Sequence, residues 1–198
     1  MNRDNARASI PAIASAILVI GVAAAAAYAL GSEAPSPPRQ TTGQLARQQY
    51  TSPNRKIDYG GFLSNALAVS KLREERRVSE PDFIEMSREP DTIVFDARSD
   101  AKYRLLHVKG AKHLSLPDVT AAELTKLIPS KTTRILIYCN NNFEGEPEAF
   151  PTKAVSASLN LYTFNTLYSY GYTNVYELGP LIDVKTSRIP FDGSKQAR

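Results

Sequence analysis

Apolar and polar residues follow one another along the chain in blocks that predict strands and helices in turn. Two short apolar runs, Thr92–Asp96 and Arg134–Tyr138, are rich in β-branched residues and are bounded by polar turn formers. Such runs are typical of buried strands. Shorter strands are predicted at 110–116 and 174–178.

Helices are predicted between the strands, where apolar residues recur at three- and four-residue spacing. Ser79 is placed to cap one of them, with Pro81 in its first turn and Pro90 as its stop. Gly171 is placed to end the last one in a left-handed conformation. The predicted helices are 59–78, 79 to the residue before Pro90, 101–107, 120–128 and 154–170. Strands that alternate with helices imply a parallel sheet with helices on both faces.

The N-terminal third has a different composition. Arg3 and Arg7 precede a nearly continuous apolar run from 10 to 30, which is typical of an export signal and is also long enough to span a bilayer. Residues 1–31 are therefore predicted to be a signal peptide or a membrane anchor, with a buried alanine-rich helix as the remaining alternative. Either of the first two places the rest of the chain outside the cytoplasm, in the periplasm or anchored facing it.

Proline and small polar residues predict a flexible linker over 32–56, and residues 57–77 are expected to form a helical extension that packs on the domain. Residues 193–198 are predicted to be a disordered tail. Membrane contact is expected only through the N-terminal segment. The sequence leaves open whether that segment is cleaved and which oligomeric state the chain adopts.

Charge and cysteine content narrow the function. The 198 residues carry a net charge of +4, but lysine and arginine are scattered and no basic-aromatic motif is present, so nucleic-acid binding is not expected. A single cysteine excludes an internal disulfide framework and a cysteine-cluster metal site. His107 and His113 are six positions apart, which is no helical metal-ligand spacing, and both are expected to be structural. No metal and no cofactor are predicted.

The one cysteine stands at a position of chemical interest. Cys139 directly follows the apolar run 134–138, so it lies at the carboxyl end of a predicted central strand, where open parallel sheets bind ligands. Three asparagines, 140–142, follow it, and asparagine tolerates the left-handed geometry of a loop curled around a sulfur. The alternatives are an ordinary turn for the asparagines and an inert, buried small residue for the cysteine.

Five separated motifs in order resemble the rhodanese-like domain: residues 93–98, Tyr103, 107–111, 135–139 and 171–178. The resemblance covers about 78–192 and implies a three-layer α/β domain with a mostly parallel five-stranded sheet. It also implies that Cys139 is the sulfur-accepting nucleophile of a sulfurtransferase, whose thiolate becomes a persulfide.

The resemblance further implies roles around the cysteine. Asn140, Asn141, Asn142, Phe143 and Lys153 would form the substrate-binding loop, with backbone N–H groups holding an anionic donor. Asp96 and Arg98 would lie beside that loop as scaffold, the alternative being a surface or half-buried ion pair.

Two departures from the family pattern stand out. The loop after Cys139 has no arginine, and no basic residue appears before Lys153. An insert near 144–152 also separates Cys139 from Gly171 by 32 residues. Glu144, Glu146 and Glu148 in this insert would repel a thiosulfate dianion if they faced the thiol, and would not if they faced solvent. The phosphatases of this fold need an arginine six positions after the cysteine, where this chain has Gly145.

Two functions remain open at this point. In the first, the chain is a sulfurtransferase of the cell envelope that passes sulfane sulfur through a Cys139 persulfide, with a small sulfur-containing anion or a protein sulfur acceptor as partner. In the alternative, it is a catalytically inactive binding module that uses the 143–152 insert. Aromatic residues of the last helix are expected to be core, with a surface patch as the alternative: Tyr162, Phe164, Tyr168, Tyr170 and Tyr172.

Overall fold

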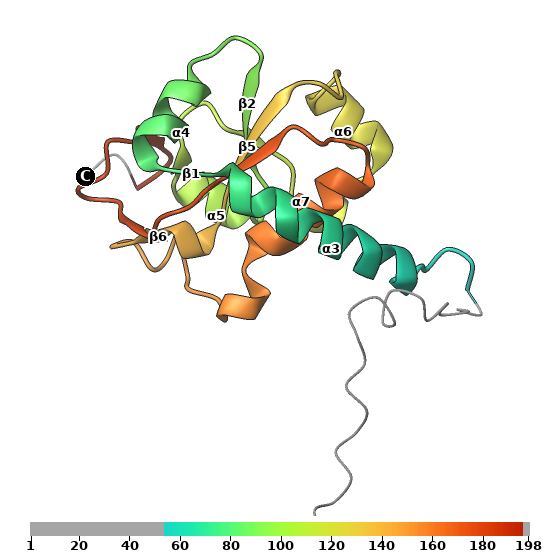
Figure 1. The fold of residues 1–198 in the computed structure, drawn as a ribbon. Helices are drawn as coiled ribbons and strands as arrows, with labels where there is room; N and C mark the ends of the chain where they lie inside the picture. The colour runs from blue at the N-terminus through green and yellow to red at the C-terminus, as the bar shows by residue number, and fades with distance from the viewer. Residues whose placement is uncertain (1–53, 196–198) are drawn as a thin grey trace, which may run out of the picture. The chain divides into compact units, whose positions relative to one another are not determined.

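The computed structural model describes residues 54–195, whose centre is a five-stranded sheet (Figure 1). Every neighbouring pair of strands is parallel. The strand order is β1 (Arg77–Val78), β7 (Val175–Leu178), β5 (Arg134–Tyr138), β2 (Thr92–Asp96) and β4 (Lys112–His113). The predicted α/β architecture is confirmed, and the two long central strands begin and end at the predicted residues.

Side chains of the central strands alternate between two hydrophobic clusters, because successive residues of a strand point to opposite faces. Ile135 and Ile137 of β5 belong to one cluster, and Leu136 and Tyr138 belong to the other. All four are buried. The sheet therefore has a packed core on each side, as a sheet covered on both faces requires.

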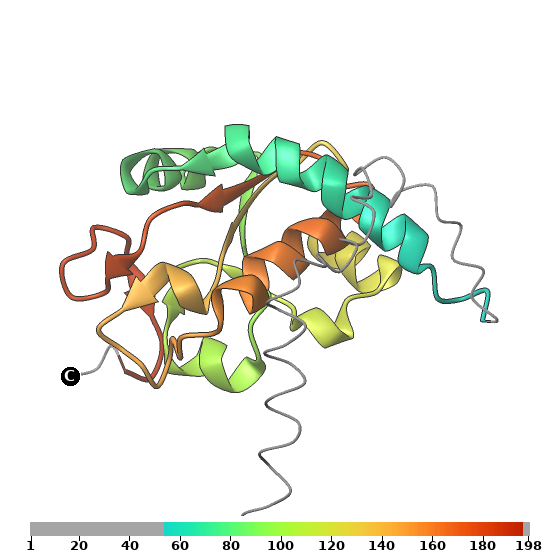
Figure 2. The ribbon, with the colours of Figure 1, turned by 60° about the horizontal axis from the view of Figure 1, so that its bottom comes forward.

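Helices cover both faces of the sheet. Residues of α3 (Tyr59–Arg76), α6 (Ala121–Leu127) and α7 (Leu159–Ser169) pack into one cluster, and Figure 2 shows α3 running alongside α7. Residues of α4 (Glu80–Ser87) and α5 (Asp100–Leu105) pack into the other. Three short 3-10 helices lie in the connections: η1 (Leu116–Asp118), η2 (Asn140–Asn142) and η3 (Val155–Ala157).

The predicted helix boundaries hold where a cap defines them. Ser79 accepts a hydrogen bond from the Asp82 N–H at the start of α4, and Gly171 adopts a φ of 82° after α7. Other boundaries differ. The predicted helix 59–78 ends at Arg76 because the next two residues form strand β1, and α7 begins at Leu159 instead of 154 because 155–157 form η3. The predicted helix 101–107 ends at Leu105 because 107–108 form a strand, and the predicted strand 110–116 is reduced to β4.

The insert and the C-terminal segment belong to the core. Strand β6 (Phe143–Glu144) pairs with β8 (Ile182–Asp183), and β3 (His107–Val108) pairs with β9 (Phe191–Asp192). The rings of Phe143, Phe150 and Phe191 form one aromatic cluster, with centroids 4.8 to 6.2 Å apart. The Ser194 and Lys195 N–H groups bond to the carbonyls of Arg104 and Leu105, so 193–195 are held in place, whereas the sequence placed them in a disordered tail.

The helical extension is bound to the sheet by a partly buried ion pair. Arg73 of α3 donates two hydrogen bonds to the carboxylate of Glu177 in β7, at 3.0 and 2.6 Å, and Val69 of α3 is buried in the core. The predicted signal peptide or anchor, and the linker up to residue 53, lie outside the described residues. Between residues 54 and 195, no helix combines the length and the hydropathy that a membrane span requires.

Candidate functional site

Cys139 lies at the carboxyl end of β5, where a single 3-10 turn follows it. It is the N-cap of η2, and its N–H donates to the Asn142 side-chain oxygen at 2.9 Å. Its sulfur lies 3.3 Å from the hydroxyl oxygen of Ser158. Because the residue is only 1% exposed, the thiol is covered in this conformation.

Ser158 is a site residue that the sequence did not reveal. It precedes α7 as the N-cap, a position where a serine hydroxyl usually accepts a hydrogen bond from its own helix. Here the hydroxyl makes no capping bond and faces the Cys139 sulfur instead. Ser158 is nineteen positions from Cys139, so neither local pattern nor spacing connects the two residues.

The side chains of the three asparagines form hydrogen bonds that connect the loop to neighbouring segments. Asn140 donates to the Pro151 carbonyl at 3.0 Å. Asn141 makes a two-point contact with the backbone of Lys153, at 2.8 and 3.0 Å. Asn142 donates to the Leu178 carbonyl at 2.7 Å. These amides are therefore used to hold the end of the insert and the end of β7.

Phe143 does not lie where the predicted substrate-binding role requires. Its ring is 1% exposed and is part of the aromatic cluster beneath the loop. A ring buried in the core cannot contact a substrate without unpacking that core. This apolar side chain packs the insert, and a substrate-binding role for Phe143 remains a prediction that its burial does not favour.

A pocket of about 310 Å³ opens beside the loop, at the carboxyl ends of β2 and β5. It is lined by Ala97, Arg98, Ser99, Lys102, Ser115, Leu116, Pro117, Asn140, Pro151, Lys153 and Leu159. Asn140 follows Cys139 in the chain and Leu159 follows Ser158, so one wall of the pocket borders the covered thiol. The lining contains no carboxylate, and the charge of Arg98 is matched by Asp96, so Lys102 and Lys153 are the groups that suit an anionic ligand.

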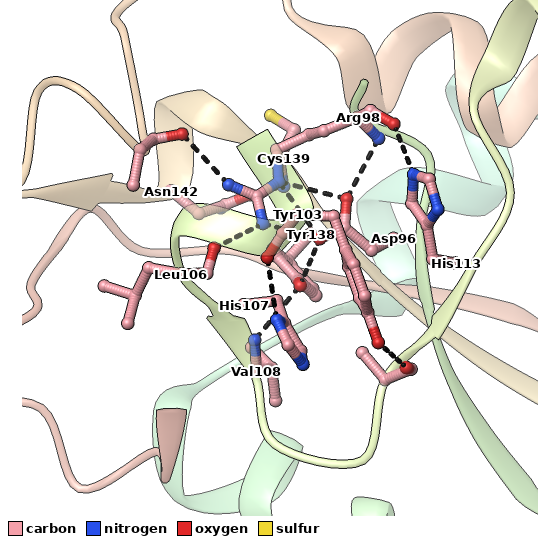
Figure 3. A network of polar contacts seen from close by, with 12 residues as sticks. Asp96, Arg98, Tyr103, Leu106, His107, Val108, His113, Tyr138, Cys139 and Asn142 are labelled. Atoms are coloured by element: carbon pink, nitrogen blue, oxygen red, sulfur yellow. Dashed lines mark hydrogen bonds and ion pairs between the residues drawn. The ribbon is translucent and has the colours of Figure 1, made fainter. Parts of the chain in front are cut away.

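Arg98, which lines this pocket, forms a buried ion pair with Asp96 (Figure 3). The guanidinium bonds to both carboxylate oxygens, with the shortest contact at 2.6 Å, and also donates to the carbonyls of Leu106 and Ala149 at 2.8 and 3.1 Å. Both residues are at most 2% exposed, so the alternative of a surface or half-buried pair is wrong. Through Ala149 the pair also anchors the insert.

Burial and neighbouring charges set the protonation states of Arg98 and Tyr138 in this network. Burial alone lowers the pKa of Arg98, but the hydrogen bonds and charge of Asp96 outweigh it and raise that pKa, so the guanidinium stays charged. Burial, reinforced by the charge of Asp96, raises the pKa of Tyr138 well above its ordinary value. The neutral Tyr138 hydroxyl donates to Asp96 and accepts the Val108 N–H at 3.1 Å.

The acidic residues of the insert do not line the pocket. Glu146 and Glu148 pair with Lys195, at 3.2 and 2.7 Å, and Glu144 is exposed. The hydrogen bonds that the Lys195 ammonium donates to Glu148 and then to Glu146 raise the pKa of Lys195. The repulsion of an anionic donor that the sequence suggested therefore has no source at the pocket wall.

Both histidines pack on one tyrosine ring. The ring centroids of His107 and His113 lie 3.8 and 4.5 Å from that of Tyr103. Each histidine also contacts a backbone carbonyl at 2.8 Å, that of Tyr103 for His107 and that of Arg98 for His113. Over the described part of the chain no group of three potential metal ligands occurs.

The aromatic residues near α7 divide between core and surface. Phe164 and Tyr172 are buried, and Tyr168 is partly buried against the same cluster. Tyr162 and Tyr170 are exposed. The expectation of core aromatics holds for the first three, and the other two reach the surface.

The solved structures that resemble this chain have low sequence identity to it. The BH2092 protein from Bacillus halodurans is 18% identical with a TM-score of 0.43, covering 67% of this chain and 85% of its own. The Alr3790 protein from Anabaena is 21% identical with a TM-score of 0.41, covering 59% and 91%. A rhodanese with anions from E. coli is 22% identical with a TM-score of 0.36, covering 52% and 99%.

Comparison with curated proteins gives no significant match. A family model described as the rhodanese-like domain matches residues 79–179, which is half of the chain. This range begins at the N-cap of α4, ends just after β7 and contains Cys139, Asp96 and Arg98. The chain belongs to the rhodanese-like domain family.

Proposed function

We propose that this chain is a sulfurtransferase of the cell envelope that carries sulfane sulfur on Cys139. One observation supports this most directly: the only cysteine of the chain lies at the carboxyl end of the central strand, next to a pocket lined by two lysines and no carboxylate. The family membership supports the same chemistry. Export of the domain is part of the proposal and rests on the apolar segment 10–30.

The proposed reaction has two steps. The Cys139 thiolate attacks the outer sulfur of a donor such as thiosulfate, the S–S bond of the donor breaks, and sulfite leaves with the electron pair. The persulfide formed on Cys139 is then attacked at its outer sulfur by an acceptor nucleophile, such as a thiolate. The bond between the two sulfurs breaks and the Cys139 thiolate is regenerated, so no external oxidant or reductant is consumed.

Particular side chains support the donor step. Lys102 and Lys153 lie in the pocket wall, and only the first has a hydrogen-bond acceptor for its ammonium group within residues 54–195, the Glu148 carbonyl at 2.7 Å. Both charges favour an anionic donor over a neutral one. The Ser158 hydroxyl, 3.3 Å from the sulfur, is placed to donate a hydrogen bond to the thiolate or to the persulfide.

The covered thiol adds a condition to the proposal. A donor reaches the sulfur only when the segment 151–158 moves away from it. Three hydrogen bonds from the Asn140 and Asn141 side chains and from the Lys153 N–H hold this segment to the loop. Hydrogen bonds of this kind contribute about 0.5–1.5 kcal/mol each, so an opening of this size is compatible with turnover.

The burial of the Cys139 thiol is also consistent with a second function, that of a binding module. If the segment never opens, the thiol is inert, and the domain serves as a binding module of the envelope. The buried cysteine and the fully engaged asparagine side chains support this alternative. The insert as its recognition surface is less favoured than the sequence suggested, because Phe143, Ala149 and Phe150 of the insert are buried.

Mass spectrometry of the intact full-length chain tests the proposal. After incubation with thiosulfate or with polysulfide over a range of pH, the wild type is expected to gain the mass of one sulfur atom, which a thiol reductant removes. Cys139→Ser is the matched control and gains nothing. Iodoacetamide labelling of native and urea-unfolded protein measures access to the thiol. A chain that labels only when unfolded and never gains sulfur refutes the sulfurtransferase and favours the binding module.

A further inference from the structure

A second pocket lies between helices α3 and α7, away from the Cys139 loop. Its volume is about 290 Å³, and it shares no lining residue with the pocket beside the thiol. The lining residues are Phe62, Ala66, Val69, Ser70, Arg73, Ser156, Leu161, Tyr162 and Asn165. Most of this wall is apolar and it contains a few polar side chains, which is the usual composition of a small-molecule site.

Asn165 in the wall of this pocket has an unused side-chain amide. The residue is 6% exposed, and its side-chain oxygen is buried without a hydrogen-bond partner. Its side-chain nitrogen also makes no hydrogen bond with any residue from 54 to 195. Asn160, five residues earlier in α7, also has an unpaired oxygen, but its nitrogen donates to Asn142 at 3.0 Å. An unpaired buried polar group is unfavourable, so an amide kept in this position points to a ligand that pairs with it.

The surroundings of Asn165 indicate the chemistry of that ligand. Two aromatic rings, Phe62 from α3 and Tyr162 from α7, are 42% and 43% exposed at the pocket, which suits a flat apolar body. Arg73 is the only charged lining residue, and its guanidinium is already neutralised by the buried carboxylate of Glu177. The pocket therefore favours a neutral head group over an anionic one.

We propose that this pocket binds a small neutral molecule with an aromatic or branched apolar body and one carboxamide-type head group that pairs with the Asn165 amide. A carboxamide both donates and accepts, so it satisfies the oxygen and the nitrogen of Asn165 together. This site shares no lining residue with the pocket beside Cys139, although Ser156 of its wall belongs to the segment 151–158 that covers the thiol. It depends on α3, the helical extension that precedes the residues matched by the family model.

Benzamide is a suitable probe, because it joins one aromatic ring to one carboxamide. The full-length chain, labelled with nitrogen-15, is titrated with benzamide while the Asn165 side-chain amide signals are followed by NMR. Saturable shifts of these signals are expected, and toluene, which lacks the head group, should bind roughly ten-fold more weakly. Shifts confined to residues of the other pocket, such as Lys102, or no shifts at all, overturn the proposal.

Two variants and a control separate a binding role from a structural one. Ala66→Leu fills the pocket and is expected to abolish the benzamide shifts, while Ser64→Leu, on the exposed side of the same helix, keeps them. Asn165→Leu is expected to abolish binding and to raise the unfolding temperature of the free protein, because an unpaired amide is replaced by an apolar side chain of similar size. A lower unfolding temperature for Asn165→Leu would show an internal partner for the amide and would overturn the proposal.

Discussion

Replacing Arg98 by methionine is expected to destabilise the domain strongly. Methionine keeps an unbranched apolar stem of similar reach, so the main loss is the guanidinium. That loss leaves the Asp96 carboxylate buried without its counter-charge, and leaves the Leu106 and Ala149 carbonyls without a donor. Breaking a buried pair on one side typically costs about 3–5 kcal/mol.

Urea unfolding at neutral pH measures this loss. With a urea dependence of about 1–3 kcal/mol per molar for a small domain, the midpoint of Arg98→Met should fall by about 2 M. Arg104→Met is the matched control, because Arg104 and its partner Asp100 are 77% and 59% exposed in their side chains. An exposed pair contributes about 0–1 kcal/mol, so the control should unfold almost as the wild type does.

Two further measurements distinguish the contribution of the Asp96–Arg98 ion pair from that of side-chain packing. The double variant Asp96→Leu with Arg98→Met removes both charges and should be less destabilised than the sum of the two single variants. Arg98→Met should also label faster with iodoacetamide at Cys139, because the Ala149 carbonyl no longer anchors the insert that leads to the covering segment. An Arg98→Met variant within about 1 kcal/mol of the wild type would refute the proposed role of the pair.

Three other predictions concern the insert, a helix end and acid stability. Phe150→Ala should lose about 3–5 kcal/mol in urea unfolding because its ring is buried, while Val155→Ala, which is exposed, should stay near the wild type. Gly171→Ala should cost about 1 kcal/mol of unfolding free energy, because φ is 82° although no atom blocks the new methyl group. Burial raises the pKa of Glu80, but hydrogen bonds from Ser187 and two backbone N–H groups outweigh it and lower that pKa. The resulting stability is present above the unfolded pKa of about 4.3 and is lost as pH falls through the folded value, so Glu80→Gln should flatten the acid limb of a stability-versus-pH curve.

Strong local patterns made most of the fold predictable. Strands β2 and β5 were placed correctly because each is an apolar run between polar turn formers, and α4 was placed by its serine cap. Strand β1 escaped prediction because Arg77 and Val78 follow a run of charged helical residues, and only pairing with β7 makes them a strand. A two-residue strand defined by a distant partner leaves no local signal.

The candidate site was predictable only where one residue and its neighbours carry the signal. The position of Cys139 after β5 followed from the sequence. The burial of Asp96 and Arg98 did not, because charged residues are rarely fully buried and each depends here on the other. Ser158 and the unpaired amide of Asn165 lie outside any motif, since their significance comes from what surrounds them in space.

The pairing of β1 with β7 has a consequence for the order in which the molecule is built. Arg77 is opposite Glu177, one hundred residues later in the chain, and Arg73 needs the same carboxylate. During synthesis, α3 emerges before the rest of the domain. The strand β7 to which it binds is made only after almost the whole domain has been synthesised. A ribosome-bound chain that stops before Val175 would leave one edge of β5 open to foreign strands. Nascent chains of increasing length should therefore acquire protease resistance in one late step, when β7 leaves the exit tunnel.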